Sequence, residues 1–256
     1  MRGKITFIGS GNLAFHLATT FDLAGYQIHQ VISRNEATGK ALAKQFAAFF
    51  SLRLEDVYAD ADFIFLSIPD KEIESSVKRI KTDIPVFVHC AGSCPLETIS
   101  NIKTNTGVLY PLQTFSKNRP VNFFEIPVFT EASNKFSTQK INELAETISN
   151  KVTELDSEKR RYLHLAAVIA NNFTNHLLAQ SEKIMTLQNL PFTLLKPLVE
   201  ETVKKAFELS PLKSQTGPAR RNDESTIAKH QEMLENDPEI KALYQIISDS
   251  IASSYK

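Results

Sequence analysis

The first fourteen residues constrain the fold of this chain more than any other segment. An apolar run at residues 4–8 leads directly into Gly9-Ser10-Gly11-Asn12-Leu13-Ala14, where an amphipathic helix pattern begins. This is the G-x-G-x-x-A pattern that joins a first strand to a first helix in dinucleotide-binding domains. The glycines permit a tight turn and a close approach of the pyrophosphate, and the helix N-terminus offers free N–H groups to the anion. The pattern therefore predicts a dinucleotide site formed by Gly9, Ser10, Gly11, Asn12 and Leu13.

Strand and helix patterns alternate through the first half of the chain. We expect strands at residues 4–8, 27–33, 62–68, 86–89, 107–110, 127–130 and 151–155, and helices at 12–24, 36–47, 71–80 and 133–150. After residue 156 only helical patterns follow, at 158–187, 191–209 and on both sides of Asp237-Pro238. The prediction is an α/β fold, with a Rossmann-type, doubly wound and mainly parallel sheet at residues 1–155 and an all-α domain at residues 156–256.

Composition excludes several classes of partner. The 29 basic residues balance 29 acidic ones, which gives no electrostatic basis for binding nucleic acid or an anionic membrane. No apolar segment has the length of a membrane span or the form of a signal peptide. The two cysteines, Cys90 and Cys94, have neither zinc-site nor redox spacing. We expect a cytoplasmic protein with free thiols and no bound metal.

The end of the second strand bears on the choice of cofactor. NAD sites usually have Asp or Glu there, bound to the ribose hydroxyls, whereas this chain has Ser33-Arg34-Asn35. Ser33 and Arg34 could bind a 2′-phosphate, so we expect NADP rather than NAD; the alternative is that Arg34 is a solvated loop residue. A strand near the centre of the sheet ends in three residues that should line the same cleft, namely Ser67, Ile68 and Pro69.

Five segments resemble known families. The start of the chain is similar to pyrroline-5-carboxylate reductases and to deazaflavin-dependent NADP reductases. Residues 89–93 (HCAGS), 110–115 (YPLQTF), 216–223 (TGPARRND) and 164–173 resemble a bacterial family of Rossmann-like proteins, generally labelled NADP oxidoreductases, whose helical C-terminal domain has no assigned function. The resemblance implies an NADP-binding first domain, and a second domain that contacts substrate and forms a homodimer through its helices.

The segment 164–173 also resembles the interdomain helix of β-hydroxyacid dehydrogenases. Aligned on Asn171-Asn172, it has Val168 where those enzymes have their catalytic Lys, and Val transfers no proton. At 100° per residue, His164 lies on the same helix stripe as Val168 and Asn171. His89 ends a parallel strand, where catalytic side chains commonly emerge. We expect His89 or His164 to act as the acid or base; the alternative is that both are structural.

Polar residues in three further segments are candidates for substrate binding. Ser93 resembles part of the substrate-binding loop of the related dehydrogenases, and Gln113 follows Tyr110-Pro111, where the family usually has His in place of Tyr110. Arg220 and Arg221 could bind an anionic substrate or instead form salt bridges to nearby acidic residues. The predicted substrate residues are Ser93, Gln113, Asn171, Asn172, Arg220 and Arg221.

These observations predict an NADP-dependent oxidoreductase. Hydride would pass between NADP(H) and a carbonyl or imine of a small, anionic substrate. A rival hypothesis, favoured by Val168, is a sensor or regulatory protein that binds NADP without turnover. A third is a structural protein that binds no dinucleotide.

Overall fold

The computed structural model describes residues 2–255, and these form two compact units. The first extends to Ala170 and the second begins at Asn171. The division into an NADP-binding domain at residues 1–155 and a helical substrate and dimerisation domain at residues 156–256 stays a prediction. No described helix has the length and apolar character needed to cross a membrane. The described residues also contain no cluster of side chains suited to holding a metal ion.

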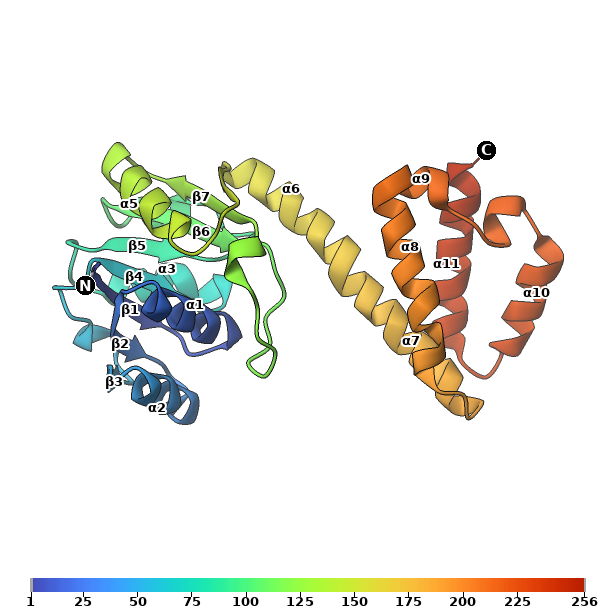
Figure 1. The fold of residues 1–256 in the computed structure, drawn as a ribbon, viewed down its shortest axis with the longest axis horizontal. Coiled ribbons are helices and arrows are strands. Elements are labelled where there is room, and N and C mark those ends of the chain that lie inside the picture. The colour runs from blue at the N-terminus through green and yellow to red at the C-terminus, as the bar shows by residue number, and fades with distance from the viewer. Residues whose placement is uncertain (1, 256) are drawn as a thin grey trace. The chain divides into compact units, whose positions relative to one another are not determined.

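The first unit is built on one eight-stranded sheet (Figure 1). Its strands follow the order β3-β2-β1-β4-β5-β6-β7-β8, and all neighbours are parallel except β6 and β7. The first six positions have the strand order of a Rossmann fold. The strands are β1 (Lys4–Ile8), β2 (Gln27–Ile32), β3 (Phe49–Ser51), β4 (Phe63–Leu66), β5 (Val86–His89), β6 (Thr106–Pro111), β7 (Val128–Ala132) and β8 (Val152–Glu154).

Helices cover both faces of this sheet because its central strands are apolar on both sides. Within β4, Phe65 belongs to one buried cluster and Ile64 to another on the opposite face. The first cluster includes residues of α1 (Asn12–Leu23), α2 (Glu36–Gln45) and α5 (Lys135–Glu146), and the second includes residues of α3 (Asp70–Arg79) and α4 (Glu97–Ser100). Two short 3₁₀ turns complete the connections, η1 (Leu54–Asp56) and η2 (Phe123–Glu125).

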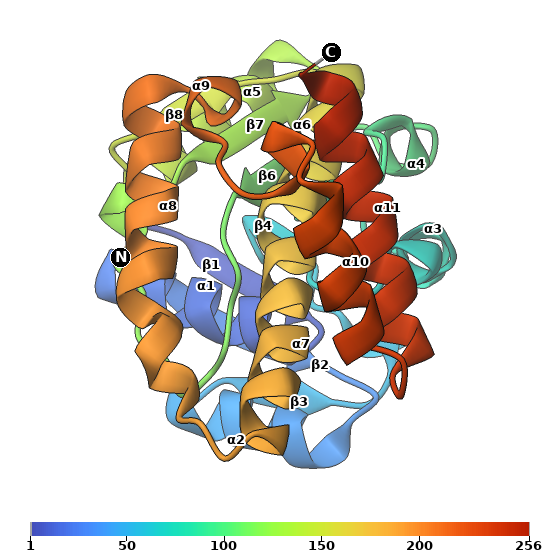
Figure 2. The same ribbon diagram turned by 90° about the vertical axis from the view of Figure 1, so that its right-hand side faces the viewer.

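The chain after β8 is helical. The expected helix at 158–187 is present as α6 (Ser157–Ala167) and α7 (Thr174–Leu187), joined by the π-helix η3 (Val168–Phe173). The second unit continues through η4 (Phe192–Leu195), α8 (Lys196–Leu209), α9 (Pro211–Ser214), η5 (Ala219–Arg221), α10 (Glu224–Met233) and α11 (Pro238–Ser254). Figure 2 shows α10 beside α11, where His230 Nδ1 and Tyr244 Oη are 2.9 Å apart.

The π-helix corrects one sequence expectation. The shared stripe of His164, Val168 and Asn171 assumed 100° of rotation per residue throughout. A π-helix closes its hydrogen bonds five residues apart and turns less per residue, so this spacing fails from Val168 to Phe173. A short strand and two short α-helices were also missed, β3, α4 and α9. They have three, four and four residues, too few to display a hydrophobic period.

Candidate functional site

A cavity of about 930 Å³ opens beside the ends of β1, β2 and β4 in the first unit. It lies where a doubly wound sheet binds its ligand, outside the carboxyl ends of the strands. Nine of the ten predicted cofactor residues line it: Gly9, Ser10, Gly11, Asn12, Ser33, Arg34, Ser67, Ile68 and Pro69. The tenth, Leu13, instead packs against the apolar core beneath the loop. Seven further polar or charged residues line this cavity and were not expected from the sequence: Asn35, Thr38, Glu72, Ser75, Ser76, Arg79 and Lys117.

The glycine loop has the shape that a pyrophosphate needs. Gly9 has a φ of +108°, and a Cβ there would lie 2.2 Å from the carbonyl oxygen of Ser67. A Cβ on Gly11 would meet no protein atom within 4 Å, so this position borders open space. Gly9 therefore lets β1 and β4 approach each other, and Gly11 leaves room for a ligand beside the start of α1.

The N-terminus of α1 is suited to an anion. No side chain caps it, and its first turn has no acidic residue. By contrast, Asn35 caps α2 and Asp156 caps α6 through hydrogen bonds to backbone N–H groups. The first N–H groups of α1 thus lack the usual side-chain acceptor, and they lie beside the open space at Gly11. These residues fit a dinucleotide pyrophosphate.

Three hydroxyl groups meet where the cavity borders the end of β2. Ser10 Oγ lies 2.8 Å from Ser33 Oγ and 2.6 Å from Thr38 Oγ1, which links the glycine loop to β2 and α2. Arg34 pairs with Glu72 of α3, at 2.8 Å between Nη2 and Oε2. Thr38 could have been recognised in the sequence as a hydroxyl in the first turn of the helix that follows Ser33-Arg34. Glu72 is remote in sequence, so only the fold places it there.

A second polar group lies at the ends of β5 and β6. Tyr110 Oη and His164 Nδ1 are 3.0 Å apart, although 54 residues separate them. Gly92, in the loop after β5, lies directly against His164, since a Cβ there would lie 2.6 Å from Nδ1. His164 is half-buried, on α6. The resemblance-based segments at 89–93, 110–115 and 164–173 therefore meet in space.

The neighbouring substrate candidates of the first unit are exposed. The Ser93 hydroxyl donates a hydrogen bond to the carboxylate of Asp70, and Gln113 Oε1 accepts one from the backbone N–H of Thr114 at 2.7 Å. Asp70 begins α3, which also contributes Glu72 to the cavity. Ser93 is next to Gly92 in the chain, so it lies close to Tyr110 and His164.

The surroundings of His89 are those of a structural residue. Its side chain is fully buried, and its Nδ1 accepts a hydrogen bond from the backbone N–H of Ala91 at 3.3 Å. Burial, with the nearby charge of Arg160, lowers the pKa of His89 from 6.5 to about 3. The ring is therefore neutral at physiological pH and holds no proton to donate as an imidazolium.

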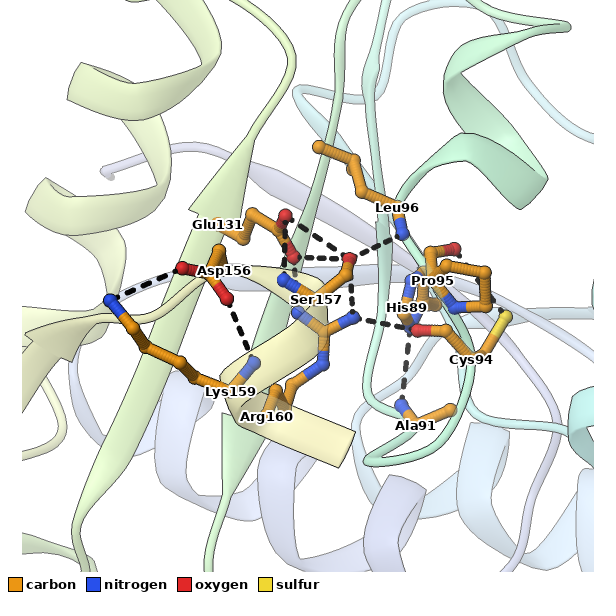
Figure 3. Close-up of polar contacts among 10 residues, drawn as sticks. All are labelled: His89, Ala91, Cys94, Pro95, Leu96, Glu131, Asp156, Ser157, Lys159 and Arg160. Carbon is orange, nitrogen blue, oxygen red and sulfur yellow. Dashed lines mark hydrogen bonds and ion pairs between the residues drawn. The ribbon is translucent and has the colours of Figure 1, made fainter. Parts of the chain in front are cut away.

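Arg160 joins three elements near this strand end (Figure 3). It is fully buried at the start of α6, where its guanidinium pairs with Glu131 of β7 and donates to the carbonyl of Cys94 at 2.6 Å. Ser157 Oγ accepts a hydrogen bond from the backbone N–H of Leu96 at 2.9 Å. These contacts hold the first turn of α6 against the loop that contains Gly92, and thereby position His164. A buried arginine was not expected, because charged residues are rarely fully buried.

The other substrate candidates belong to the second unit. Asn171 and Asn172 are exposed in the π-helix. The guanidinium carbon of Arg220 lies 4.8 Å from the centre of the Tyr255 ring, and Arg221 is exposed. Among described residues no ion pair joins either arginine to an acidic side chain. Asp223 instead caps α10 by accepting from the backbone N–H of Thr226 at 3.0 Å.

Two family models match the chain. Residues 4–88 match "NADP oxidoreductase coenzyme F420-dependent", and residues 126–251 match "Domain of unknown function (DUF2520)". No curated protein matches the chain. The first range runs from β1 to β5 and contains every residue that lines the cavity except Lys117, and the second runs from β7 into α11.

Solved structures of several reductases are similar to this one. A Bacteroides fragilis protein, provisionally named an NADP oxidoreductase, is 40% identical, with a TM-score of 0.92 and 98% of each chain covered. An imine reductase from Myxococcus stipitatus in complex with NADP⁺ is 14% identical, with a TM-score of 0.67 over 98% of this chain and 92% of the other. Pyrroline-5-carboxylate reductase from Streptococcus pyogenes is 13% identical, with a TM-score of 0.62 over 98% of both chains.

The last two similarities show a shared fold, whereas the first shows family membership. The sequence resemblance to Rossmann-like NADP oxidoreductases with a helical C-terminal domain is confirmed, as is the fold class. The chain belongs to the family that joins a Rossmann-type NADP oxidoreductase domain to the DUF2520 domain.

Proposed function

We propose that this protein is an NADP-dependent oxidoreductase that transfers a hydride between NADP(H) and a small, anionic carbonyl or imine compound. The observation that carries the proposal is the contact of Tyr110 with His164 against Gly92, at the ends of β5 and β6, next to β4, whose end lines the cavity. The family supports oxidoreduction, and reductases of imines and of pyrroline carboxylate share the fold.

The cavity residues would hold the cofactor. Backbone N–H groups at residues 9–13 would bind the pyrophosphate, while Ser33 and Arg34 would bind the 2′-phosphate, which makes NADP the proposed cofactor over NAD. Ser67, Ile68 and Pro69 line the same cavity. The bound nicotinamide supplies the hydride.

His164 is the proposed proton donor or acceptor. Burial raises the pKa of Tyr110, so the phenol keeps its proton at neutral pH and can donate a hydrogen bond to Nδ1 of His164. The ring proton is then on Nε2, where it can donate a hydrogen bond to the substrate. As that proton passes to the carbonyl oxygen or imine nitrogen with the hydride, the phenol proton of Tyr110 would move to Nδ1, so the imidazole stays neutral and the tyrosinate regains a proton from water. His89 is left out of this step because its side chain is fully buried and does not line the cavity.

The substrate would be held by the exposed polar residues. Ser93 beside Gly92 is the proposed contact nearest to His164, and Gln113 is a further one in the same unit. Asn171 and Asn172 would add amide groups, and Arg220 and Arg221 would bind an anionic group of the substrate. We also propose a cytoplasmic homodimer formed through the C-terminal helices, which expose Leu198, Phe207 and Ile246. If light scattering gives the mass of a single chain, the proposed dimer is refuted.

Single-turnover oxidation of NADPH tests the reaction. The protein would be mixed with NADPH and a panel of keto acids, cyclic imines and a deazaflavin, and the loss of NADPH absorbance followed. Oxidation with a member of this panel is expected, and it should slow in His164→Gln. Cofactor binding, measured in parallel on the same protein, should be tighter for NADPH than for NADH. Equal affinities would refute the proposed preference for NADP over NAD.

The second candidate function is an NADP-bound sensor without turnover. The observation that favours it is Val168, which stands where the β-hydroxyacid dehydrogenases have their catalytic Lys. Tight NADPH binding with no oxidation across the whole panel would support the sensor over the enzyme.

A further inference from the structure

The loop between β6 and η2 is fastened to α1, outside the glycine pattern. The side-chain amide of Asn12 donates to the carbonyl of Phe115 at 2.9 Å. One turn along the helix, His16 Nε2 lies 2.9 Å from the carbonyl oxygen of Ser116. A carbonyl only accepts, so Nε2 carries a proton in this contact. Since His16 is almost fully buried, the loop has a defined position over the start of α1.

Lys117 follows these two anchored carbonyls and lines the cofactor cavity. Its ammonium lies 5.9 Å from the centre of the Phe15 ring. The backbone N–H of Phe15 donates to the carbonyl of Gly11, so the two residues belong to the first turn of α1. The anchored loop therefore places a cation near the helix end whose N–H groups have no capping side chain.

Lys117 differs from the two arginines that line the same cavity. Arg34 pairs with Glu72, and Arg79 pairs with Glu55 at 2.8 Å. Among the residues that the structure describes, Lys117 forms no ion pair. It is half-buried, so its attraction for an anion is screened less than that of a fully exposed lysine.

We propose that Lys117 binds the pyrophosphate of the cofactor from the loop that is anchored to the start of α1. This inference rests on the proposed dinucleotide binding. It adds a charge-assisted contact from a loop that the Rossmann fingerprint does not include. Asn12 and His16 position the loop, and the lysine makes the contact.

The test compares Lys117→Met with Lys140→Met in the full chain. Lys140 is a matched control because its ammonium also lies beside a phenylalanine ring, that of Phe136 on α5, at 6.0 Å. Dissociation constants for NADPH and NADH are measured by fluorescence titration at low and moderate salt. Lys117→Met should weaken the binding of both cofactors by roughly fivefold and reduce the salt dependence of that binding. Lys140→Met should change neither the binding nor its salt dependence.

Three results would overturn the inference, and they are distinguishable. If Lys117→Met weakens the binding of NADPH but not that of NADH, the lysine contacts the 2′-phosphate rather than the pyrophosphate. If it weakens neither cofactor while the wild-type protein binds them, the lysine has no role, and the proposed function stands. If the wild-type protein binds neither cofactor, the proposed function fails and this inference fails with it.

Discussion

Replacing Gly92 by Ala tests the proposed proton-transfer group most directly. The added Cβ would lie 2.6 Å from Nδ1 and 2.7 Å from Cγ of His164, while ordinary contacts begin at 3.4 Å. The ring or the loop must therefore move by about 0.8 Å to restore an ordinary contact, the difference between 3.4 and 2.6 Å. The atoms involved lie at the root of the imidazole, so a rotation of a flexible side-chain end gives no relief.

This displacement is large compared with the tolerance of the contact. The 3.0 Å hydrogen bond between Tyr110 and His164 fails if Nδ1 moves that far from the hydroxyl. A misplacement of about 1 Å can cost on the order of 100-fold in rate, and overpacking costs about 1–3 kcal/mol of stability. Gly92 does not line the cofactor cavity, so NADPH affinity should be unchanged.

The assay is single-turnover NADPH oxidation with whichever panel compound the wild-type protein reduces, together with urea unfolding and NADPH titration. Gly11→Ala is the matched control, because its Cβ meets no protein atom within 4 Å. It should keep the wild-type stability and weaken NADPH binding, the opposite pattern to Gly92→Ala. A folded Gly92→Ala protein that turns over within twofold of the wild-type rate would refute the assignment of His164.

Three more perturbations have defined outcomes. Arg160→Met leaves Glu131 without its buried partner and should lower the free energy of unfolding by about 3 kcal/mol in urea denaturation; a loss below about 1 kcal/mol would contradict the role given to this pair. The pKa of His89 falls from 6.5 to about 3 on folding, so between these values the unfolded chain binds the extra proton and stability falls as the pH is lowered, by up to about 1.4 kcal/mol per pH unit. His89→Asn should flatten this acid limb of a stability–pH curve, and an unchanged slope would refute the buried, neutral state. Arg34→Ala should lower the affinity for NADPH by about tenfold and leave the affinity for NADH unchanged in a fluorescence titration. Equal losses of affinity for both would show that Arg34 does not bind the 2′-phosphate.

Local sequence patterns predicted the features of the site that depend on backbone geometry. The G-x-G-x-x-A pattern located the turn after β1, because a tight turn and a close phosphate require small residues at fixed spacing. The strand pattern placed β1 and β5 at the observed residues. It failed for β3, whose three residues pair only with β2 at the edge of the sheet.

Contacts between distant segments could not be predicted in the same way. Nothing in the sequence near Tyr110 specifies that His164 will meet it, since the pairing depends on how α6 leaves the sheet. The burial of Arg160 depends likewise on Glu131 and the Cys94 carbonyl, which come from two other elements. The π-helix after Ala167 changed the helical phase that the sequence argument assumed.

The uncapped start of α1 also has a thermodynamic consequence. A ligand that satisfies these N–H groups binds the folded chain and not the unfolded one, so it raises the midpoint of thermal unfolding. At a ligand concentration 100 times the dissociation constant the gain is about 2.7 kcal/mol. A melting curve can therefore rank nucleotides before any substrate is known, and compounds that raise the midpoint further in the presence of NADPH become the first candidates for the reaction.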